Sequence, residues 1–192
     1  MKKFFYPIAV LFFILILSCG EETLPKPKAQ LRLEYPEALY ELEAKDLPLT
    51  FEKNKLAKAV YQSGANNRQK AVNLEYPLLN ATVYLSYMPV TNNIDSLLRD
   101  AQNLTQKHVV KADDIQSDLY ENEVRNVYGM FYQVLGNAAS QSQFYATDSV
   151  NHFLTGSLYF YAKPNFDSIQ PAAAYIQNDM VRLMETIVWK KP

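Results

Sequence analysis

The sequence predicts an α+β domain in which an antiparallel β-sheet is packed by two amphipathic helices. Three observations predict this class. Several segments alternate apolar and polar residues, which is typical of half-buried strands. Two longer segments repeat apolar residues at the spacing of one helical face. Short turns join the later strands, which favours antiparallel pairing, with the helices covering the sheet.

The N-terminus has the three zones of a secretory signal peptide, over residues 1–18. Lys2 and Lys3 give a positive start, residues 4–17 are almost entirely apolar, and the small Ser18 closes the segment. A helix that spans a bilayer needs roughly 20 apolar residues, so this run is too short to cross comfortably.

Residues 16–19, Ile-Leu-Ser-Cys, resemble the lipobox of bacterial lipoproteins. The resemblance implies cleavage between Ser18 and Cys19, a diacylglycerol on the thiol of Cys19, and acylation of the freed amine. Cys19 is the only cysteine of the chain and lies where an anchor is needed. The alternative is an ordinary signal peptide followed by an unmodified thiol. Several acyl chains hold a protein firmly on a membrane, so no transmembrane helix is required.

The remaining chain divides into residues 19–29, a lipidated cysteine with an extended proline-containing tether, and residues 30–192, a single soluble domain. Removing Lys2 and Lys3 from the 19 basic residues leaves 17 against 20 acidic residues, a net charge of −3. No basic patch indicates a nucleic-acid partner. Beyond Cys19 the chain has no thiol for a disulfide, for catalysis or for metal binding.

Four strands are expected before the first helix, over residues 31–35, 49–52, 56–61 and 81–88. The last of them is the clearest, because Val83 and Leu85 alternate with polar residues and Pro89 follows.

The period then changes to that of a helix over residues 93–111, with Asn92 or Asn93 as N-cap. Asp95 near its start and Lys111 near its end suit the helix dipole. Its apolar stripe comprises Ile94, Leu97, Leu98, Ala101, Leu104, His108 and Val109.

Strands are expected again over residues 124–135, 140–147 and 152–162, and their short turns predict a meander. A second helix follows, capped by Asp167 or Ser168, with Pro171 in its first turn. Its stripe comprises Tyr175, Ile176, Met180, Leu183, Met184, Ile187 and Val188, and Trp189 closes it. This order of elements resembles the PsbP-like α+β sandwich, a fold of binding and assembly proteins.

The sequence offers little catalytic chemistry. His108 and His152 have no acidic or thiol residue nearby at the spacing of metal ligands, so we expect no metal site and no cofactor. Two pairs of carboxylates occur, Asp113 with Asp114 and Glu121 with Glu123. We expect both pairs to lie in a polar connector on the solvated surface. Phosphate-binding loops, nucleophile elbows and metalloprotease motifs are all missing, and the prediction is that the protein is no enzyme.

Tyrosine is abundant, with 14 residues, and some of them fall at outward-facing positions of the expected strands. Such tyrosines could line a binding face, because each combines a large contact area with a polar tip. Cross-strand aromatic pairing within the sheet is the simpler interpretation. The residues concerned are Tyr84, Tyr128, Tyr132 and Tyr159.

Residues 25–28, Pro-Lys-Pro-Lys, and residues 31–36, Leu-Arg-Leu-Glu-Tyr-Pro, come shortly after the lipobox and resemble the start of the gliding-motility lipoprotein family GldD. The stretch 144–149, Phe-Tyr-Ala-Thr-Asp-Ser, the strand 153–161 and the terminal helix ending near Trp189 fit the same family. The resemblance implies a cell-envelope lipoprotein required for surface gliding, a process tied to type IX protein secretion. It provides no catalytic residues.

Three Asp-Ser-aliphatic triplets match the acceptor pattern of an O-glycosylation system found in some gliding bacteria. They lie at 95–97, 148–150 and 167–169. Two of them coincide with expected helix starts, where Asp and Ser are favoured anyway. Ser149, in an expected loop, is therefore the best candidate.

These observations together predict a non-enzymatic structural or interaction protein, held on a membrane by its lipid and facing the periplasm, with the outer membrane favoured. Its expected partners are the membrane itself and other gliding and secretion proteins. One alternative is a binding module for a small or lipidic ligand held between sheet and helix. Another is an envelope hydrolase, which would need His108, His152 or carboxylates to converge in one cleft.

Overall fold

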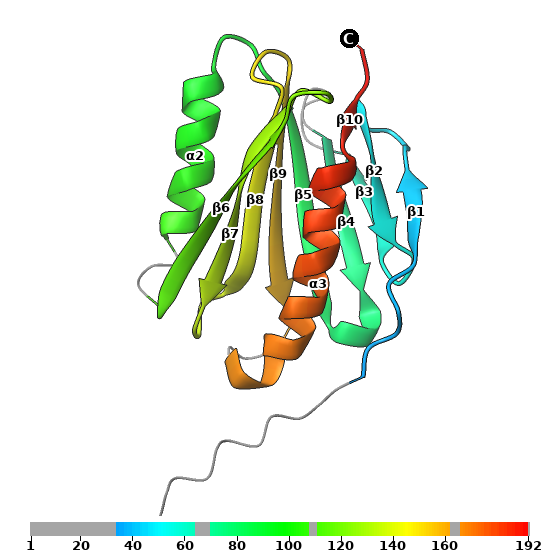
Figure 1. Ribbon diagram of the computed structural model, residues 1–192, viewed down its shortest axis with the longest axis vertical. Coiled ribbons are helices and arrows are strands. Elements are labelled where there is room, and N and C mark those ends of the chain that lie inside the picture. The colour runs from blue at the N-terminus through cyan, green and yellow to red at the C-terminus, as the bar shows by residue number, and fades with distance from the viewer. Residues whose placement is uncertain (1–33, 64–69, 108–110, 162–165, 192) are drawn as a thin grey trace, which may run out of the picture. The chain divides into compact units, whose positions relative to one another are not determined.

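The structure is a computed structural model, and it describes residues 34–63, 70–107, 111–161 and 166–191. All of them belong to one compact unit, Leu31–Pro192. The described residues form two antiparallel sheets and two long helices, which confirms the α+β class (Figure 1).

The larger sheet has seven strands in the order β3-β4-β5-β9-β8-β7-β6. Strands β6 to β9 form a meander, and β9 then pairs with β5 along nine residues. The strands are β3 (Lys58–Ser63), β4 (Lys70–Tyr76), β5 (Ala81–Pro89), β6 (Asp114–Asn122), β7 (Val127–Leu135), β8 (Ser140–Thr147) and β9 (His152–Phe160).

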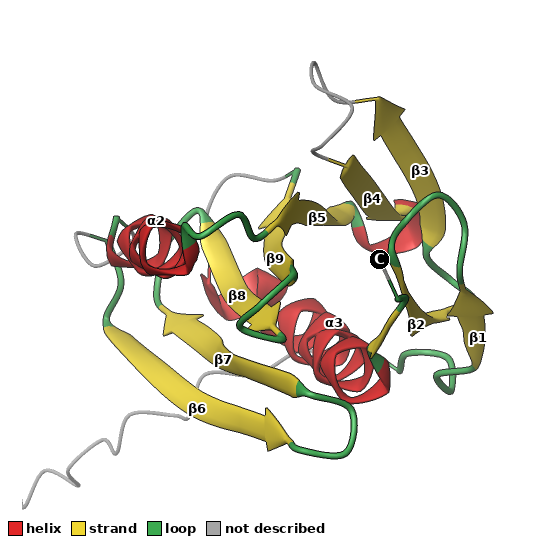
Figure 2. Ribbon diagram, turned by 90° about the horizontal axis from the view of Figure 1, so that it is seen from above, coloured by secondary structure: helices red, strands yellow, loops and turns green. Residues whose placement is uncertain are grey.

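A smaller sheet has the order β1-β2-β10, formed by β1 (Tyr40–Glu43), β2 (Leu49–Asn54) and β10 (Val188–Trp189). Helix α3 (Phe166–Thr186) lies between the two sheets and contacts β2 and β8 (Figure 2). Helix α2 (Ile94–Gln106) packs on the other face of the large sheet, against β8. A short 3-10 helix, η1 (Pro77–Leu79), joins β4 to β5.

The main core fills the space between the large sheet, α3 and β2. Val83 and Leu85 point into it from β5, as their alternation predicts, and Leu49 and Phe51 point into it from β2. The stripe predicted for the terminal helix is confirmed for its five central members, which are all buried, namely Ile176, Met180, Leu183, Met184 and Ile187. Val188 is the exception, because the chain leaves the helix before it and Val188 is exposed in β10.

The first expected strand is wrong in the part that the structure describes. Residues 31–33 lie outside the described residues, and residues 34–39 are not in a strand. The Tyr35 ring instead stacks on Tyr175 of α3, with ring centroids 5.1 Å apart, and Pro36 has no N–H for a ladder. Side-chain packing on the helix therefore replaces strand pairing here, and β1 starts only at Tyr40.

Strands β1, β4, β6 and β10 were not expected. In β4, Val72, Leu74 and Tyr76 are buried and alternate with the polar Asn73 and Glu75, so the apolar–polar pattern of a strand was present. Residues 114–122, expected within a polar connector, form the edge strand β6. Most of its side chains are exposed on both faces, so no alternation marks it, and its backbone pairing with β7 holds it in the sheet. The carboxylates of this region are exposed, as expected.

The helix boundaries also differ from expectation. Helix α2 ends at Gln106 rather than at residue 111, and Leu97 and Thr105 are its buried residues. Asn93 does precede the helix, but its Oδ1 accepts from the N–H of Thr91, at 2.7 Å, instead of capping the helix. Helix α3 begins at Phe166, which places Asp167 within its first turn and Pro171 inside the helix.

One glycine is required by close packing across β8 and β9. Gly156 lies opposite Phe144, and a Cβ at position 156 would overlap the Phe144 ring. The ring occupies the space that any larger residue at 156 would need, and overpacking a buried position costs typically about 1–3 kcal/mol.

We expect Gly156→Ala to lower the free energy of unfolding by about 1–3 kcal/mol, measured by urea denaturation. Phe144→Leu in the same chain should offset part of this loss, so that the two changes are coupled by about 0.5 kcal/mol or more. Ser86→Ala, at an exposed position on β5, serves as the control and should change little. Strict additivity of the two changes would show that the ring does not require the glycine.

Candidate functional sites

The expected cleavage and lipidation site, Ser18 and Cys19, lies outside the described residues, so it stays a prediction. In the part of the chain that the structure describes, no helix is long and apolar enough to cross a membrane.

Ser149 lies in the turn between β8 and β9, where its side chain is exposed. Asp148 fixes this turn, because its Oδ1 accepts from the backbone N–H groups of Val150, Asn151 and His152 at 2.7–3.0 Å. Burial alone would raise the pKa of Asp148, but these three N–H groups favour the carboxylate and hold its pKa below the ordinary value. The serine of this triplet is thus presented by a well-defined turn, with a positive φ of 67°.

The other two serines with the same sequence pattern lie within helices. Ser96 is in the first turn of α2 and Ser168 is near the start of α3, and both are exposed. The expectation that these two triplets accompany helix starts is confirmed.

His152 is a core residue. Its Nδ1 is 2.9 Å from the hydroxyl of Tyr87, and its ring stacks on Trp189 with the ring planes 2° apart. His108 lies outside the described residues. Among the residues that are described, no three His, Cys, Asp or Glu side chains come together as metal ligands would. His152 is therefore held inside the domain by packing and a hydrogen bond.

A buried carboxylate, Asp179 of α3, is the polar centre of the domain, with only 4% of its surface exposed. Its Oδ1 accepts from the Tyr40 hydroxyl at 2.8 Å. Its Oδ2 accepts from Asn54 Nδ2 at 2.9 Å and from the Tyr76 hydroxyl at 3.0 Å. Since the donors come from β1, β2 and β4, one side chain ties α3 to both sheets.

The three donors of Asp179 are uncharged. Arg182, one turn further along α3, directs its guanidinium to Glu52, with Nη2 at 2.7 Å from Oε2. Burial raises the pKa of Asp179 above its ordinary value, although the hydrogen bonds from Tyr40, Asn54 and Tyr76 oppose the shift. Desolvation, with the neighbouring carboxylate, in turn raises the pKa of Tyr76 far above the usual range.

Asp179 was not predicted as a buried polar residue, although its place in the sequence indicates one. Asp179 stands among apolar residues of the terminal helix, between Ile176 and Leu183, on the stripe that faces the core. An acidic residue at such a position must either be exposed by a twist of the helix or receive hydrogen bonds in the interior.

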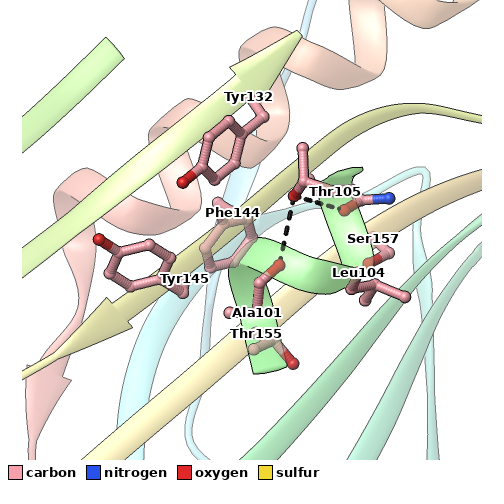
Figure 3. Close-up of a pocket in the computed structure, with 9 residues that line it drawn as sticks. Ala101, Leu104, Thr105, Tyr132, Phe144, Tyr145, Thr155 and Ser157 are labelled. Atoms are coloured by element: carbon pink, nitrogen blue, oxygen red, sulfur yellow. Dashed lines mark hydrogen bonds between the residues drawn. The ribbon is translucent and has the colours of Figure 1, made fainter. Parts of the chain in front are cut away.

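Figure 3 shows residues that line a small cavity between α2 and the large sheet. The cavity there is ≈ 10 Å³, room for about one water molecule. Thr105 lies over it and donates to Gln143 Oε1 at 2.9 Å, and its hydroxyl also lies 3.4 Å from the carbonyl of Ala101. This geometry does not favour a small or lipidic ligand held between this helix and the sheet.

The outward-facing tyrosines support the interpretation as sheet packing. Tyr84 on β5 and Tyr159 on β9 meet edge to face, with centroids 5.7 Å apart. The Tyr84 hydroxyl is also 2.7 Å from that of Tyr161. Such diagonal aromatic pairs stabilise neighbouring strands.

Lysines gather in a surface depression between β1, β2 and β3, and two glutamates lie among them. Lys45, Lys53, Lys55 and Lys58 line it together with Glu41 and Glu43. Lys53 donates to Glu41 and to the carbonyl of Ala57. The hydrogen bond from Lys53 lowers the pKa of Glu41. Glu43 accepts from the Tyr61 hydroxyl and from two backbone N–H groups.

The fold and these sites define an α+β domain with a hydrogen-bonded carboxylate in its core. The chain belongs to the family described as gliding motility lipoprotein GldD, whose sequence model matches residues 20–189. Membership of a lipoprotein family implies a membrane-anchored protein of the cell envelope.

A search of curated proteins found no match. Among solved structures, the chain is similar to the solution structure of cyanobacterial PsbP (CyanoP) from Synechocystis sp. PCC 6803. The two are 9% identical, with 86% of this chain and 99% of that chain covered and a TM-score of 0.48.

The raised pKa of Asp179 gives a testable pH dependence. A raised pKa means that the folded state binds the proton more tightly than the unfolded state does. The resulting stabilisation is fully present below the unfolded-state pKa of about 3.9 and is lost as pH rises through the folded-state pKa. Asp179→Asn removes this titration, so wild type should lose stability relative to the variant as pH rises from about 4 towards neutrality.

Urea denaturation of both proteins across this pH range measures the difference. Asp118→Asn, on the exposed edge strand β6, is the matched control and should follow wild type. A constant difference between wild type and Asp179→Asn at all pH values would contradict the raised pKa.

Proposed function

We propose that the chain is a lipid-anchored, non-enzymatic component of the bacterial cell envelope that is required for gliding motility and for the associated type IX protein secretion. Membership of the GldD family over residues 20–189 carries the proposal. In this proposal signal peptidase cuts between Ser18 and Cys19, and lipid on Cys19 fixes the chain to a membrane. The domain then faces the periplasm, with the outer membrane favoured.

The proposed mechanism is positional. The lipid fixes one end of the chain, the residues that follow give limited reach, and the folded domain presents its surfaces to other gliding and secretion proteins. Two observations support a structural role. His152 is engaged by Tyr87 and Trp189, and Asp179 accepts from three uncharged donors inside the core. Neither group is placed to act on a substrate.

A clean deletion should abolish colony spreading and single-cell gliding and should reduce secretion of type IX substrates. The Cys19→Ala protein, which cannot take the lipid, should appear in the soluble or a wrong fraction and should fail to restore gliding. Wild type and Ser86→Ala, supplied in the same way, should both restore it. Normal gliding in the deletion strain would overturn the proposal, and normal secretion with lost gliding would remove its secretion part.

We also propose that Ser149 carries an O-linked glycan. Support comes from its Asp-Ser-aliphatic pattern and from its exposure in a turn that Asp148 holds in place. Intact-mass measurement of protein expressed in a gliding bacterium should show hexose increments, which Ser149→Ala should reduce and Ser96→Ala should leave unchanged. A mass without any such increments would remove the idea.

A further inference from the structure

Two surface depressions are lined by neighbouring residues of the connection between β4 and β5. This connection lies at the end of the domain where the described chain begins (Figure 1). The 3-10 helix η1 lies between them, with Pro77 lining the lysine depression and Leu78 and Leu79 lining the second. The second depression, the apolar groove, is completed chiefly by Tyr35, Pro36, Phe160, Ile169 and Ala172. The 3-10 helix η1 therefore lines both the cationic depression and the apolar groove.

The lysine depression has an excess of positive charge. Four lysines and two glutamates line it, a net charge of +2. Both glutamates already receive hydrogen bonds, Glu41 from Lys53 and Glu43 from Tyr61. Lys55 and Lys58 are exposed and form no ion pair within the described residues, although Glu75 lies opposite Lys58 in the strand register. Lys55 lies near enough to Glu41 to help lower the pKa of that carboxyl, while both lysines keep exposed ammonium groups that can face an anion.

The apolar side of this end is unusually exposed for large aliphatic residues. Leu78 on η1 is 80% exposed and Leu39 is 58% exposed. Leu39 also adjoins the lysines, because its carbonyl accepts from the N–H of Lys55 at 2.8 Å. Exposed leucines beside unpaired lysines are the combination found on surfaces that lie at a membrane interface.

We propose that this end of the domain docks on a membrane leaflet that contains anionic phospholipids. Lys55 and Lys58 face the phosphates of the headgroups, and Leu78 and Leu39 enter the boundary between headgroups and acyl chains. The proposal rests on the proposed lipidation of Cys19. The domain would then rest on the membrane that anchors it rather than move freely at the end of its tether.

The length of chain before the domain favours a membrane as the occupant. Glu34, the first described residue, itself lines the apolar groove. From Cys19 to Glu34 a fully extended chain reaches at most roughly 50 Å. A lipid on Cys19 therefore keeps the leaflet within reach of the surface from which the chain leaves. A soluble anion would use the lysines but would leave the exposed leucines without a role.

The test uses mature, lipidated, full-length protein in vesicles, with one nitroxide label at a time. The lipid caps the native thiol of Cys19, so an introduced cysteine takes the label alone. Leu78→Cys reports on the proposed surface. Val124→Cys is the matched control, since Val124 is 94% exposed in the β6–β7 turn at the opposite end of the domain (Figure 1). Relaxation by oxygen, compared with a water-soluble nickel complex, measures depth in the bilayer.

In vesicles of phosphatidylglycerol and phosphatidylethanolamine, the label at 78 should lie in the lipid interface and the label at 124 in water. Lys55→Gln with Lys58→Gln should shift the docking equilibrium by roughly 30-fold towards the undocked form. Lys70→Gln with Lys191→Gln removes the same charge from the opposite end and should leave docking unchanged. Unchanged thermal unfolding of both double variants shows that the fold is intact.

Any of five results would overturn the proposal. Both labels in water would mean that the domain is free on its tether, and both labels in lipid would mean nonspecific adsorption. Equal docking on phosphatidylcholine would exclude recognition of anionic headgroups. Displacement of docked protein by millimolar glycerol phosphate would assign the lysines to a soluble phosphate ester. If the mass shows that the protein lacks acyl chains, and the protein leaves the vesicles, the proposed anchor is refuted and docking with it.

Discussion

The fold depends on a carboxylate that is buried without a cation among its hydrogen-bond donors. Asp179 accepts from Tyr40, Asn54 and Tyr76, and through them α3 is joined to β1, β2 and β4. A buried group of this kind is costly unless its hydrogen bonds are all made, so the elements must meet in one arrangement. The apolar packing of α3 supplies the larger stabilisation, while this cluster fixes how the helix is seated between the sheets.

The clearest predictions from the sequence are those in which apolar residues recur with a regular period. The α3 stripe and the Val83 and Leu85 face of β5 are buried as that period predicts. Strand β8 is buried on both faces, so its place follows from the short turns of the meander rather than from alternation. Strand β6 buries little on either face, and its place is decided by backbone pairing with β7, which no side-chain pattern records. The prediction for the residues before β1 was wrong for another reason. Apolar and polar residues do alternate there, but Tyr35 packs on a helix instead of in a sheet.

The candidate sites divide in the same way. The candidate site at Ser149 could be predicted from three consecutive residues, because the neighbouring Asp148 forms the turn that exposes it. The lysine depression could not, because β1, β2 and β3 bring Lys45, Lys55 and Lys58 together only after folding, around partners such as Tyr61. Because the whole chain is nearly neutral, its net charge does not indicate this local excess of positive charge.

Helix α3 and β10 follow every strand of the large sheet in the sequence, and this order has a consequence for folding. The large sheet is complete in sequence by Phe160, but α3 covers its inner face together with β2, and β2 gains its second partner from Val188 and Trp189. A chain that is synthesised from its N-terminus therefore cannot close this core before residues 166–189 are available. Until then the apolar face of the sheet lacks its helix, which delays folding of the whole domain rather than of one part.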